Sequence, residues 1–182
     1  QFLKERGAVV VNADLLGHQA YLPGTLGFDQ VVAAFGDEIV GNDGHVDRKK
    51  LGSIVFADPK QMERLNGIMH PIIRGLIEGR LDEMYREEEK VSVVEAAVLI
   101  EAGWKPVFDE IWVVTANVEE IVSRLQSRNG LTREDAQRRI DSQISSDDRA
   151  SQGDILLDNN GTVEELKDKV NNLWKERVHQ FN

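Results

Sequence analysis

Cysteine is absent from the 182-residue sequence, which excludes disulfide bonds and thiolate metal sites and gives no sign of an oxidising compartment. Long hydrophobic runs are absent too: no stretch approaches the ~20 apolar residues that span a bilayer, and no signal-peptide pattern opens the chain. Basic residues are outnumbered, with 22 Lys and Arg against 32 Asp and Glu, and the resulting net charge of -10 argues against nucleic acid as the main partner. We therefore predict a cytoplasmic protein without a membrane or nucleic-acid partner.

Several enzyme motifs are missing as well. No His/Asp/Glu spacing is typical of a structural metal site, no G-x-S-x-G motif indicates a hydrolase, and the phosphate-binding motif G-x-x-x-x-G-K-[ST] does not occur. The chain does have 41% hydrophobic and 30% charged residues, which is typical of soluble globular proteins. Its length suits one sizeable core, or a domain with a subdomain.

Four short apolar runs alternate with helical patterns, and we predict strands at 8–11, 91–94, 110–115 and 154–158. The run at 91–94 is β-branched and follows a charged segment, which fits a strand buried on both faces, although a buried helix has the same signature. Residues 15–89 show only helical patterns. This order predicts an α/β fold with a parallel sheet, right-handed crossovers and a helical insertion after the first strand.

Helix boundaries follow from cap residues. The predicted N-caps are Asp58, Asn117, Thr132 and Thr162. We expect His70-Pro71 to interrupt the helix that Asp58 starts, and a long amphipathic helix to run from there to about Glu88. The helix that follows Thr132 is predicted to end at Ile144.

Carboxylates stand at the carboxyl ends of two predicted strands: Asp14 follows the strand at 8–11, and Glu95 follows the strand at 91–94. Ligands of open α/β sheets collect outside the carboxyl ends of the strands. Glu95 could therefore hold Mg²⁺ beside a phosphate, directly or through water; alternatively, it caps a helix or pairs with an arginine. Asp14 is predicted to be an N-cap, a base at an acceptor site, or both.

Arginines concentrate in one part of this acidic chain, at Arg124, Arg128, Arg133, Arg138, Arg139 and Arg149. We expect about half of them to be solvated residues of charged helices. The others suit a lid that closes over polyphosphate, because bidentate guanidinium groups neutralise phosphoryl charge and a closed lid excludes water. His70 precedes a proline at an expected helix start, and a structural or capping role is favoured over a catalytic one.

Ten short segments, in order along nearly the whole chain, resemble the dephospho-coenzyme A kinase family. They are NAD at 12–14, PGT at 23–25, FG at 35–36, DG-x-VDR at 43–48, VF-x-D at 55–58, HP at 70–71, VLIE at 98–101, FDEIWVV at 108–114, RNGLTREDAQRRIDSQ at 128–143 and DNNG at 158–161. The wording at 16–21 (LGHQAY) and 95–104 (EAAVLIEAGW) further resembles the kinase domain of animal-type bifunctional coenzyme A synthases.

The resemblance implies a P-loop NTPase fold of the nucleoside-monophosphate-kinase type. Such an enzyme uses ATP and Mg²⁺ to phosphorylate the ribose 3′-hydroxyl of dephospho-coenzyme A, the final step of coenzyme A synthesis. The resemblance further implies a nucleotide-binding core at 1–14 and 91–182, a lid at about 128–150, and a helical acceptor subdomain at 15–90. The implied site residues are Asp14 and Arg139 for catalysis, Arg128 and Asn159 for ATP, and Arg48, His70 and Arg74 for the acceptor.

The chain departs from the family pattern in two places. Glu95 stands where the family usually has Asp, so the arm of the candidate Mg²⁺ ligand is longer. The family's first strand and P-loop precede a helix whose tail matches residues 1–6, so we expect a P-loop segment upstream and poor ATP binding without it. Two other hypotheses stay open: a nucleoside or sugar kinase of the same fold, and a non-catalytic domain that binds a nucleotide or coenzyme A.

Overall fold

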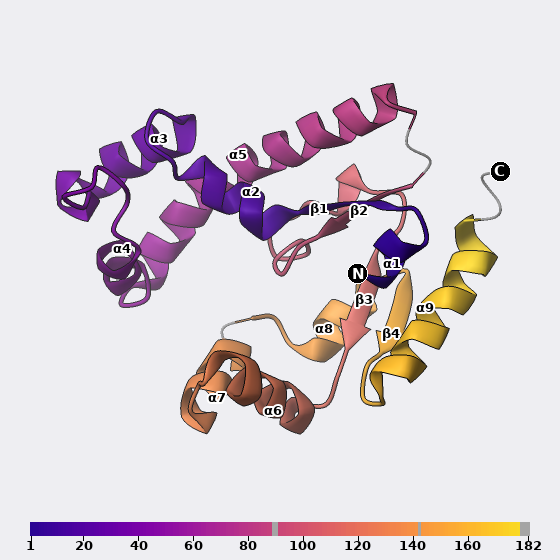
Figure 1. Cartoon of the computed structure of the whole chain (residues 1–182). Helices are drawn as coiled ribbons and strands as arrows, with labels where there is room; N and C mark the ends of the chain where they lie inside the picture. Colours follow the sequence, from indigo (N-terminus) through magenta and orange to yellow (C-terminus); the bar gives the residue numbers. More distant parts are fainter. Residues whose placement is uncertain (89–90, 142, 179–182) are drawn as a thin grey trace. The chain divides into compact units, whose positions relative to one another are not determined.

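The computed structural model describes residues 1–88, 91–141 and 143–178 (Figure 1). By its internal contacts the chain divides into two compact units. The helical unit is Ala8–Ala97, and the C-terminal unit combines Gln1–Gly7 with Val98–Asn182. The functional division into a nucleotide core, a lid and an acceptor subdomain stays a prediction. Within the described ranges, no helix is both long enough and apolar enough to cross a membrane.

In the helical unit, a series of helices separates two parallel strands. The elements are β1 (Val9–Asn12), α2 (Ala13–Ala20), α3 (Leu26–Phe35), the 3₁₀ helix η1 (Asp37–Ile39), α4 (Arg48–Val55), α5 (Pro59–Arg86) and β2 (Ser92–Glu95). β1 and β2 pair in parallel, with Val9 opposite Ser92 and Asn12 opposite Glu95. The segment between the strands is helical, as its apolar periodicity predicts.

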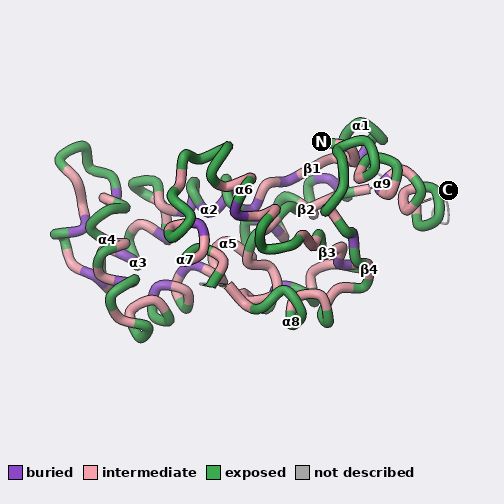
Figure 2. The backbone as a smooth tube through the Cα atoms, turned by 90° about the horizontal axis from the view of Figure 1, so that it is seen from below, coloured by how far each residue is buried: buried purple, intermediate pink, exposed green. Residues whose placement is uncertain are grey.

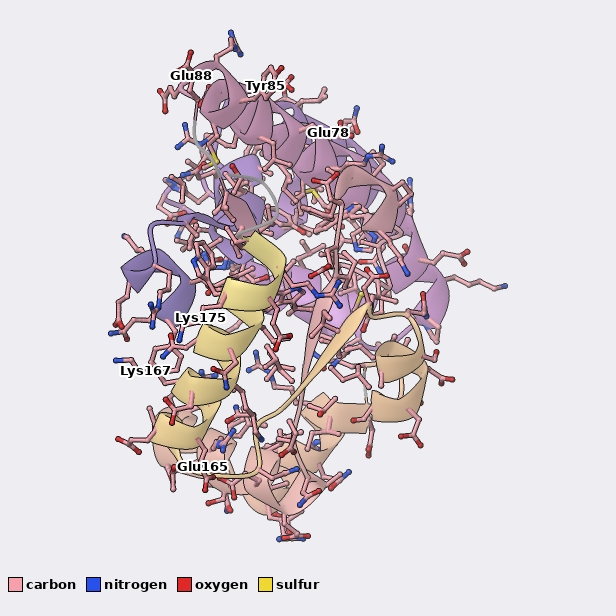
Figure 3. All side chains as sticks on the ribbon, turned by 90° about the vertical axis from the view of Figure 1, so that its right-hand side faces the viewer. Glu78, Tyr85, Glu88, Glu165, Lys167 and Lys175 are labelled. Atoms are coloured by element: carbon pink, nitrogen blue, oxygen red, sulfur yellow. The ribbon has the colours of Figure 1, made fainter. Side chains whose placement is uncertain are left out.

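In the C-terminal unit, a second parallel pair carries helices before and after each strand. The elements are α1 (Phe2–Glu5), the 3₁₀ helix η2 (Lys105–Val107), β3 (Trp112–Thr115), α6 (Val118–Asn129), α7 (Arg133–Asp141), α8 (Ser146–Ser151), β4 (Ile155–Asp158) and α9 (Val163–Val178). Trp112 pairs with Ile155 and Thr115 with Asp158. In Figure 3, the labelled side chains of Glu165, Lys167 and Lys175 lie on α9.

Three of the four predicted N-caps are confirmed, whereas Asn117 stands at the N-cap position of α6 but its side chain makes no capping hydrogen bond. Asp58 accepts a hydrogen bond from the backbone N–H of Lys60 at 2.9 Å. Thr132 accepts one from the N–H of Asp135 at 3.1 Å. Thr162 and Glu165 form a reciprocal capping box: Thr162 Oγ1 accepts from the N–H of Glu165 at 3.2 Å, and the carboxylate of Glu165 accepts from the N–H of Thr162 at 2.9 Å.

The prediction of a strand buried on both faces is wrong for β2. Its end residues Ser92 and Glu95 are exposed, and Val93 and Val94 are half-buried. Among the described residues the strands form two separate pairs, so each strand has only one hydrogen-bonded neighbour. A β-branched run therefore indicated a strand correctly, but it did not indicate how deeply the strand is buried.

The predicted interruption at His70-Pro71 is also wrong, because α5 continues through Pro71 without a break. Proline has no N–H to donate to the carbonyl four residues earlier, which is that of Gly67. Packing against α2, α3 and α4 along its length holds α5 together despite this lost bond. The burial of Leu65, Met69 and Ile77 in the interior outweighs the tendency of Pro71 to end the helix.

The helix predicted from Thr132 to Ile144 is shorter than expected. It corresponds to α7, which ends at Asp141; Ser142 lies outside the described residues. A further helix, α8, begins at Ser146, and the side chain of Ser145 caps it by accepting a hydrogen bond from the N–H of Asp148 at 3.0 Å. The Ser-Ser-Asp-Asp sequence is a helix start that the periodicity analysis did not identify.

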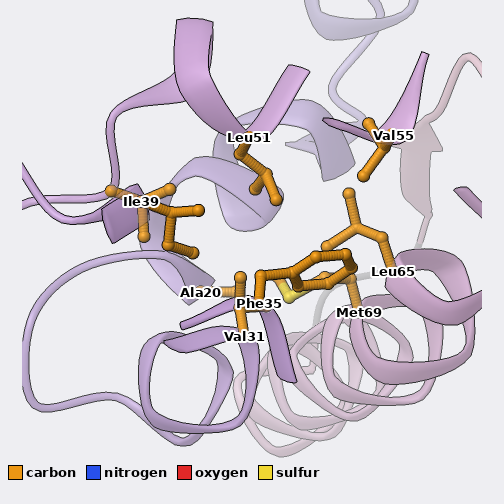
Figure 4. Close-up of a cluster of buried hydrophobic side chains, with 9 residues drawn as sticks. Ala20, Val31, Phe35, Ile39, Leu51, Val55, Leu65 and Met69 are labelled. Atoms are coloured by element: carbon orange, nitrogen blue, oxygen red, sulfur yellow. The ribbon is translucent and has the colours of Figure 1, made fainter. Parts of the chain in front are cut away.

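The main hydrophobic core of the helical unit joins α2, α3, α4 and α5 (Figure 4). It contains Ala20, Val31, Phe35, Ile39, Val46, Leu51, Val55, Leu65 and Met69. Buried and exposed positions alternate along these helices, as Figure 2 shows. A Cβ atom at Gly27 would lie 2.2 Å from the carbonyl oxygen of Ala20, so only glycine permits this close approach of α3 to the end of α2.

Candidate functional site

The first turn of α2 follows β1 directly and carries Asp14. The N-cap of α2 is Asn12, whose side-chain oxygen accepts a hydrogen bond from the N–H of Leu15 at 3.0 Å. The prediction that Asp14 caps the helix is therefore wrong. Asp14 lies inside the first turn and is exposed, which leaves its carboxylate to solvent or to a ligand. A negative charge in this turn is also favourable toward the helix dipole.

Glu95 lies at the same edge of the β1–β2 pair as Asp14. Its register partner is Asn12, two residues before Asp14, because the carboxyl ends of parallel strands meet at one edge. Glu95 is exposed. Across the described ranges, no three His, Asp or Glu side chains gather as a ready-made metal site. A magnesium site can nevertheless have one carboxylate as its protein ligand, because waters and substrate phosphates supply the other ligands of the octahedron.

Arg48, the first residue of α4, meets the exposed face of α2. Its Nη1 atom lies 3.0 Å from Nε2 of His18, and its guanidinium carbon lies 5.8 Å from the centre of the Tyr21 ring. Analysis of the sequence did not identify His18. The available signal was its spacing: His18 follows Asp14 by four residues, which places both side chains on one face of α2.

The two other predicted acceptor residues are on α5. His70 and Arg74 are one turn apart and half-buried. The guanidinium group of Arg74 donates to the Glu78 carboxylate at 2.9 Å, so this arginine already has an acidic neighbour. Gly17 of α2 packs close to Ile73, which lies between His70 and Arg74 in sequence.

An open groove of about 870 Å³ lies between α2, α3 and α5. Its lining is mostly apolar and comprises Gln19, Ala20, Leu22, Thr25, Leu26, Gly27, Gln30, Gly67, Ile68, Pro71, Ile72, Gly75 and Leu76. Leu22 and Leu26 are exposed at 47% and 62%. Gly67 and Pro71 both line the groove, and Pro71 has no N–H to donate to the carbonyl of Gly67.

In the C-terminal unit, Arg124 links α6 to the turn after β4. It donates to the carbonyl of Asn159 at 2.9 Å and to the carboxylate of Glu120 at 3.0 Å. Arg128 follows Arg124 by one helical turn and is exposed. The structure thus brings the two predicted ATP residues, Arg128 and Asn159, to neighbouring elements of one unit. Their role in binding ATP stays a prediction.

Carboxylates pair with most of the clustered arginines. Arg133 pairs with Glu119, which raises the pKa of the guanidinium group and lowers the pKa of the carboxyl group. Arg138 bonds to Asp135 on its own helix, and this bond is the main cause of the lowered pKa of Asp135. Arg139 is the next residue of α7 and is exposed.

Arg149 of α8 makes the least exposed ion pair among the described residues. Its Nη2 atom lies 2.8 Å from the Glu101 carboxylate, and the two side chains are 25% and 20% exposed. The same Nη2 atom donates to Gln143 at 3.2 Å. The second carboxylate oxygen of Glu101 is buried without a hydrogen-bond partner among the described residues. This pair ties the turn before η2 to the segment that follows α7.

Solved structures with the same fold identify the class. A crystal structure from Thermus thermophilus is 28% identical, with a TM-score of 0.79 over 97% of this chain and 88% of that one. A Campylobacter jejuni protein called dephospho-CoA kinase has 22% identity and a TM-score of 0.69 over 98% of this chain and 90% of its own, and it shows the fold alone. The parallel strands, the helical insertion and the predicted fold class are confirmed as an α/β fold of the P-loop NTPase type.

Within that class, the chain belongs to the dephospho-CoA kinase family, whose model matches residues 1–165. A protein of Geobacter sulfurreducens called dephospho-CoA kinase is 45% identical over 177 residues, which cover 97% of this chain and 90% of the relative. One of Symbiobacterium thermophilum with the same name is 39% identical over 173 residues, covering 95% and 72%. The predicted family is confirmed; the likeness to bifunctional synthases stays a prediction.

Proposed function

We propose that the full-length product of the gene encoding these 182 residues transfers the γ-phosphoryl group of ATP to the ribose 3′-hydroxyl of dephospho-coenzyme A. The observation that carries the proposal is that the exposed carboxylates of Asp14 and Glu95 both lie at the carboxyl edge of a parallel strand pair, in a chain of the dephospho-CoA kinase family. The 3′-oxygen forms a bond to the γ-phosphorus, the bond to the β–γ bridging oxygen breaks, and ADP leaves.

The residues predicted for the site have distinct parts in this reaction. Asp14 orients the 3′-hydroxyl and accepts its proton, while Arg139 stabilises the charge on the transferring phosphoryl group. Arg128 and Asn159 hold the adenine of ATP, in a nucleotide-binding core formed by residues 1–14 and 91–182. Glu95 would hold Mg²⁺, which neutralises phosphate charge when bound. Its exposed carboxylate is an oxygen donor, which fits this hard cation.

The acceptor lies along the helical unit. Arg48, His70 and Arg74 are its polar contacts, and the groove between α2, α3 and α5 takes the pantetheine arm. The arm is uncharged, long and carries two amide groups, and the groove is mostly apolar with the polar side chains of Gln19, Thr25 and Gln30 in its lining. The groove begins at Gln19, five residues after Asp14, or about 7.5 Å along α2.

The test of the function is ADP formation by the full-length gene product, with ATP, Mg²⁺ and one acceptor at a time. Dephospho-coenzyme A should be phosphorylated, and adenosine and gluconate should react at least about 10²-fold less efficiently, since they lack the diphosphate and the arm. Equal or better turnover of either rival would move the function to another small-molecule kinase. A folded protein that binds ATP without any turnover would instead indicate a binding domain.

The groove assignment predicts a specific effect of Gly75→Leu. No protein atom lies within 4 Å of a Cβ placed at Gly75, so the new side chain fits without displacing the fold and projects into the groove. We expect the KM for dephospho-coenzyme A to rise about tenfold, the loss of roughly 1.4 kcal/mol of binding. The KM for ATP should stay unchanged. Both constants are read from steady-state kinetics of the full-length protein.

Gly79→Leu is the matched control. Gly79 is one turn further along α5, is equally open around its Cβ position, and does not line the groove. Both variants replace a glycine at an exposed position inside α5. Each should stabilise the helix by about 0.5–1 kcal/mol, measured as a higher Tm. An unchanged KM in Gly75→Leu, or the same increase in both variants, would show that the pantetheine arm lies elsewhere.

A further inference from the structure

The pairing of Arg48 with His18 determines the chemical state of the histidine ring. A guanidinium group has only N–H donors, so at 3.0 Å the Nε2 atom of His18 must be the acceptor. This hydrogen bond requires the tautomer that carries its proton on Nδ1. Tyr21 contributes a second contact, since the Arg48 guanidinium lies over the Tyr21 ring. Two side chains of one helix segment thus orient a single arginine.

No carboxylate among the described residues forms an ion pair with Arg48. The nearest acid in sequence, Asp47, is engaged with the backbone N–H groups of Lys49 and Lys50 at 3.0 and 3.1 Å. The contacts of Arg48 with the His18 and Tyr21 rings bring no negative charge to its guanidinium group. Lys49 and Lys50 follow it, so this is a local region of positive charge in a chain of net charge -10.

The positions of these groups along α2 match the order of groups in the acceptor. Asp14, His18 and Leu22 follow one another at intervals of four residues, or about 6 Å each while the helix lasts. In dephospho-coenzyme A the ribose 3′-hydroxyl is followed by the 5′-diphosphate and then by the pantetheine arm. With the hydroxyl at Asp14 and the arm in the groove that Leu22 lines, the diphosphate falls beside His18 and Arg48.

We propose that Arg48 binds the 5′-diphosphate of the acceptor and that His18 is a positioning residue, which holds the Arg48 guanidinium in the orientation that meets these phosphates. The proposal rests on the proposed function, because it assumes that the acceptor's reacting hydroxyl lies at Asp14. His18 does not touch the reacting atoms, so its loss should weaken acceptor binding and leave the chemical step nearly unchanged.

The test compares His18→Ala, His18→Gln, Arg48→Ala and the double variant His18→Ala/Arg48→Ala. We expect His18→Ala to raise both the KM and the Kd for dephospho-coenzyme A about tenfold, with kcat and the KM for ATP within about twofold of the wild type. His18→Gln should restore most of the affinity, since its amide oxygen can accept from the guanidinium in place of Nε2. Calorimetry gives Kd, and steady-state assays give the kinetic constants.

The double variant separates a positioning role from direct contact. If His18 acts through Arg48, the double variant should bind dephospho-coenzyme A no more weakly than Arg48→Ala alone. Adenosine, which has the ribose without phosphates, should bind to the wild type and to Arg48→Ala alike. Additive losses in the double variant, or a failure of His18→Gln to recover affinity, would overturn the positioning role. Equal loss of adenosine binding would overturn the diphosphate as the target.

Two further outcomes keep this proposal distinct from the function on which it rests. A wild-type protein that neither binds nor phosphorylates dephospho-coenzyme A would refute the proposed function. A wild type that does both, with His18→Ala indistinguishable from it, would refute only the role of His18. His18 and Arg48 are both exposed, so the Tm of each variant should stay within a few degrees of the wild type. A larger drop in Tm together with a lower kcat would mark a structural role instead.

Discussion

The Asp14→Asn variant of the full-length gene product should phosphorylate dephospho-coenzyme A with a kcat lower by a factor on the order of 10² or more. An amide has nearly the same shape as a carboxylate but cannot take a proton from the 3′-hydroxyl. The KM values for both substrates should change by less than about threefold, because the amide oxygen still accepts the hydrogen bond that positions the hydroxyl. Initial rates at saturating ATP and acceptor measure the effect.

Folding is expected to survive this substitution, which makes the kinetic result interpretable. Asp14 is exposed and is not the N-cap, so the cap bond from Asn12 to Leu15 is retained. The cost is a lost charge in the first turn of α2, about 0.3–1 kcal/mol. Asp29→Asn is the matched control: Asp29 is an exposed acid in the first turn of α3 and should lose the same small stability with normal kcat. Normal turnover by Asp14→Asn would remove Asp14 from the chemical step.

The sequence predicted the carboxyl ends of the strands well, for a physical reason. β-branched runs are strong strand signals, and parallel strands place their carboxyl ends at one edge, so Asp14 and Glu95 could each be assigned to the ligand-binding edge from the sequence. The helix start was less certain. Asn12 and Asp14 are both good capping residues two positions apart, and only the backbone conformation decides between them: Asn12 is extended, at φ -99° and ψ 108°.

Tertiary contacts account for what the sequence did not predict. Pro71 is a strong local signal for a break, and burial along α5 overrides it. Arg48 and His18 are 30 residues apart, and the apolar periodicity of the sequence does not predict that α4 contacts α2. The same holds for Arg149 and Glu101, which form an ion pair although they are 48 residues apart. Local rules describe each element, whereas the partners of exposed charged residues depend on how the elements pack.

The last prediction concerns the lid. Arg139→Ala in the full-length gene product should lower kcat by a factor on the order of 10²–10³, because removing a donor that stabilises transition-state charge has about this effect. Arg139→Lys should recover only part of the loss, since an ammonium group keeps the charge but not the planar pair of donors. Single-turnover measurements with pre-bound ATP would separate this loss from weaker ATP binding.

Arg138 provides a control on the same helix. It is adjacent to Arg139, it is 78% exposed, and it bonds to Asp135 within α7. Because successive residues of a helix differ by about 100° in direction, Arg138 and Arg139 cannot both face the transferring phosphoryl group. Arg138→Ala should therefore keep kcat within about twofold of the wild type. If Arg138→Ala were the slow variant and Arg139→Ala the normal one, α7 would present its other face to ATP, and the assignment of the lid arginine would pass to Arg138.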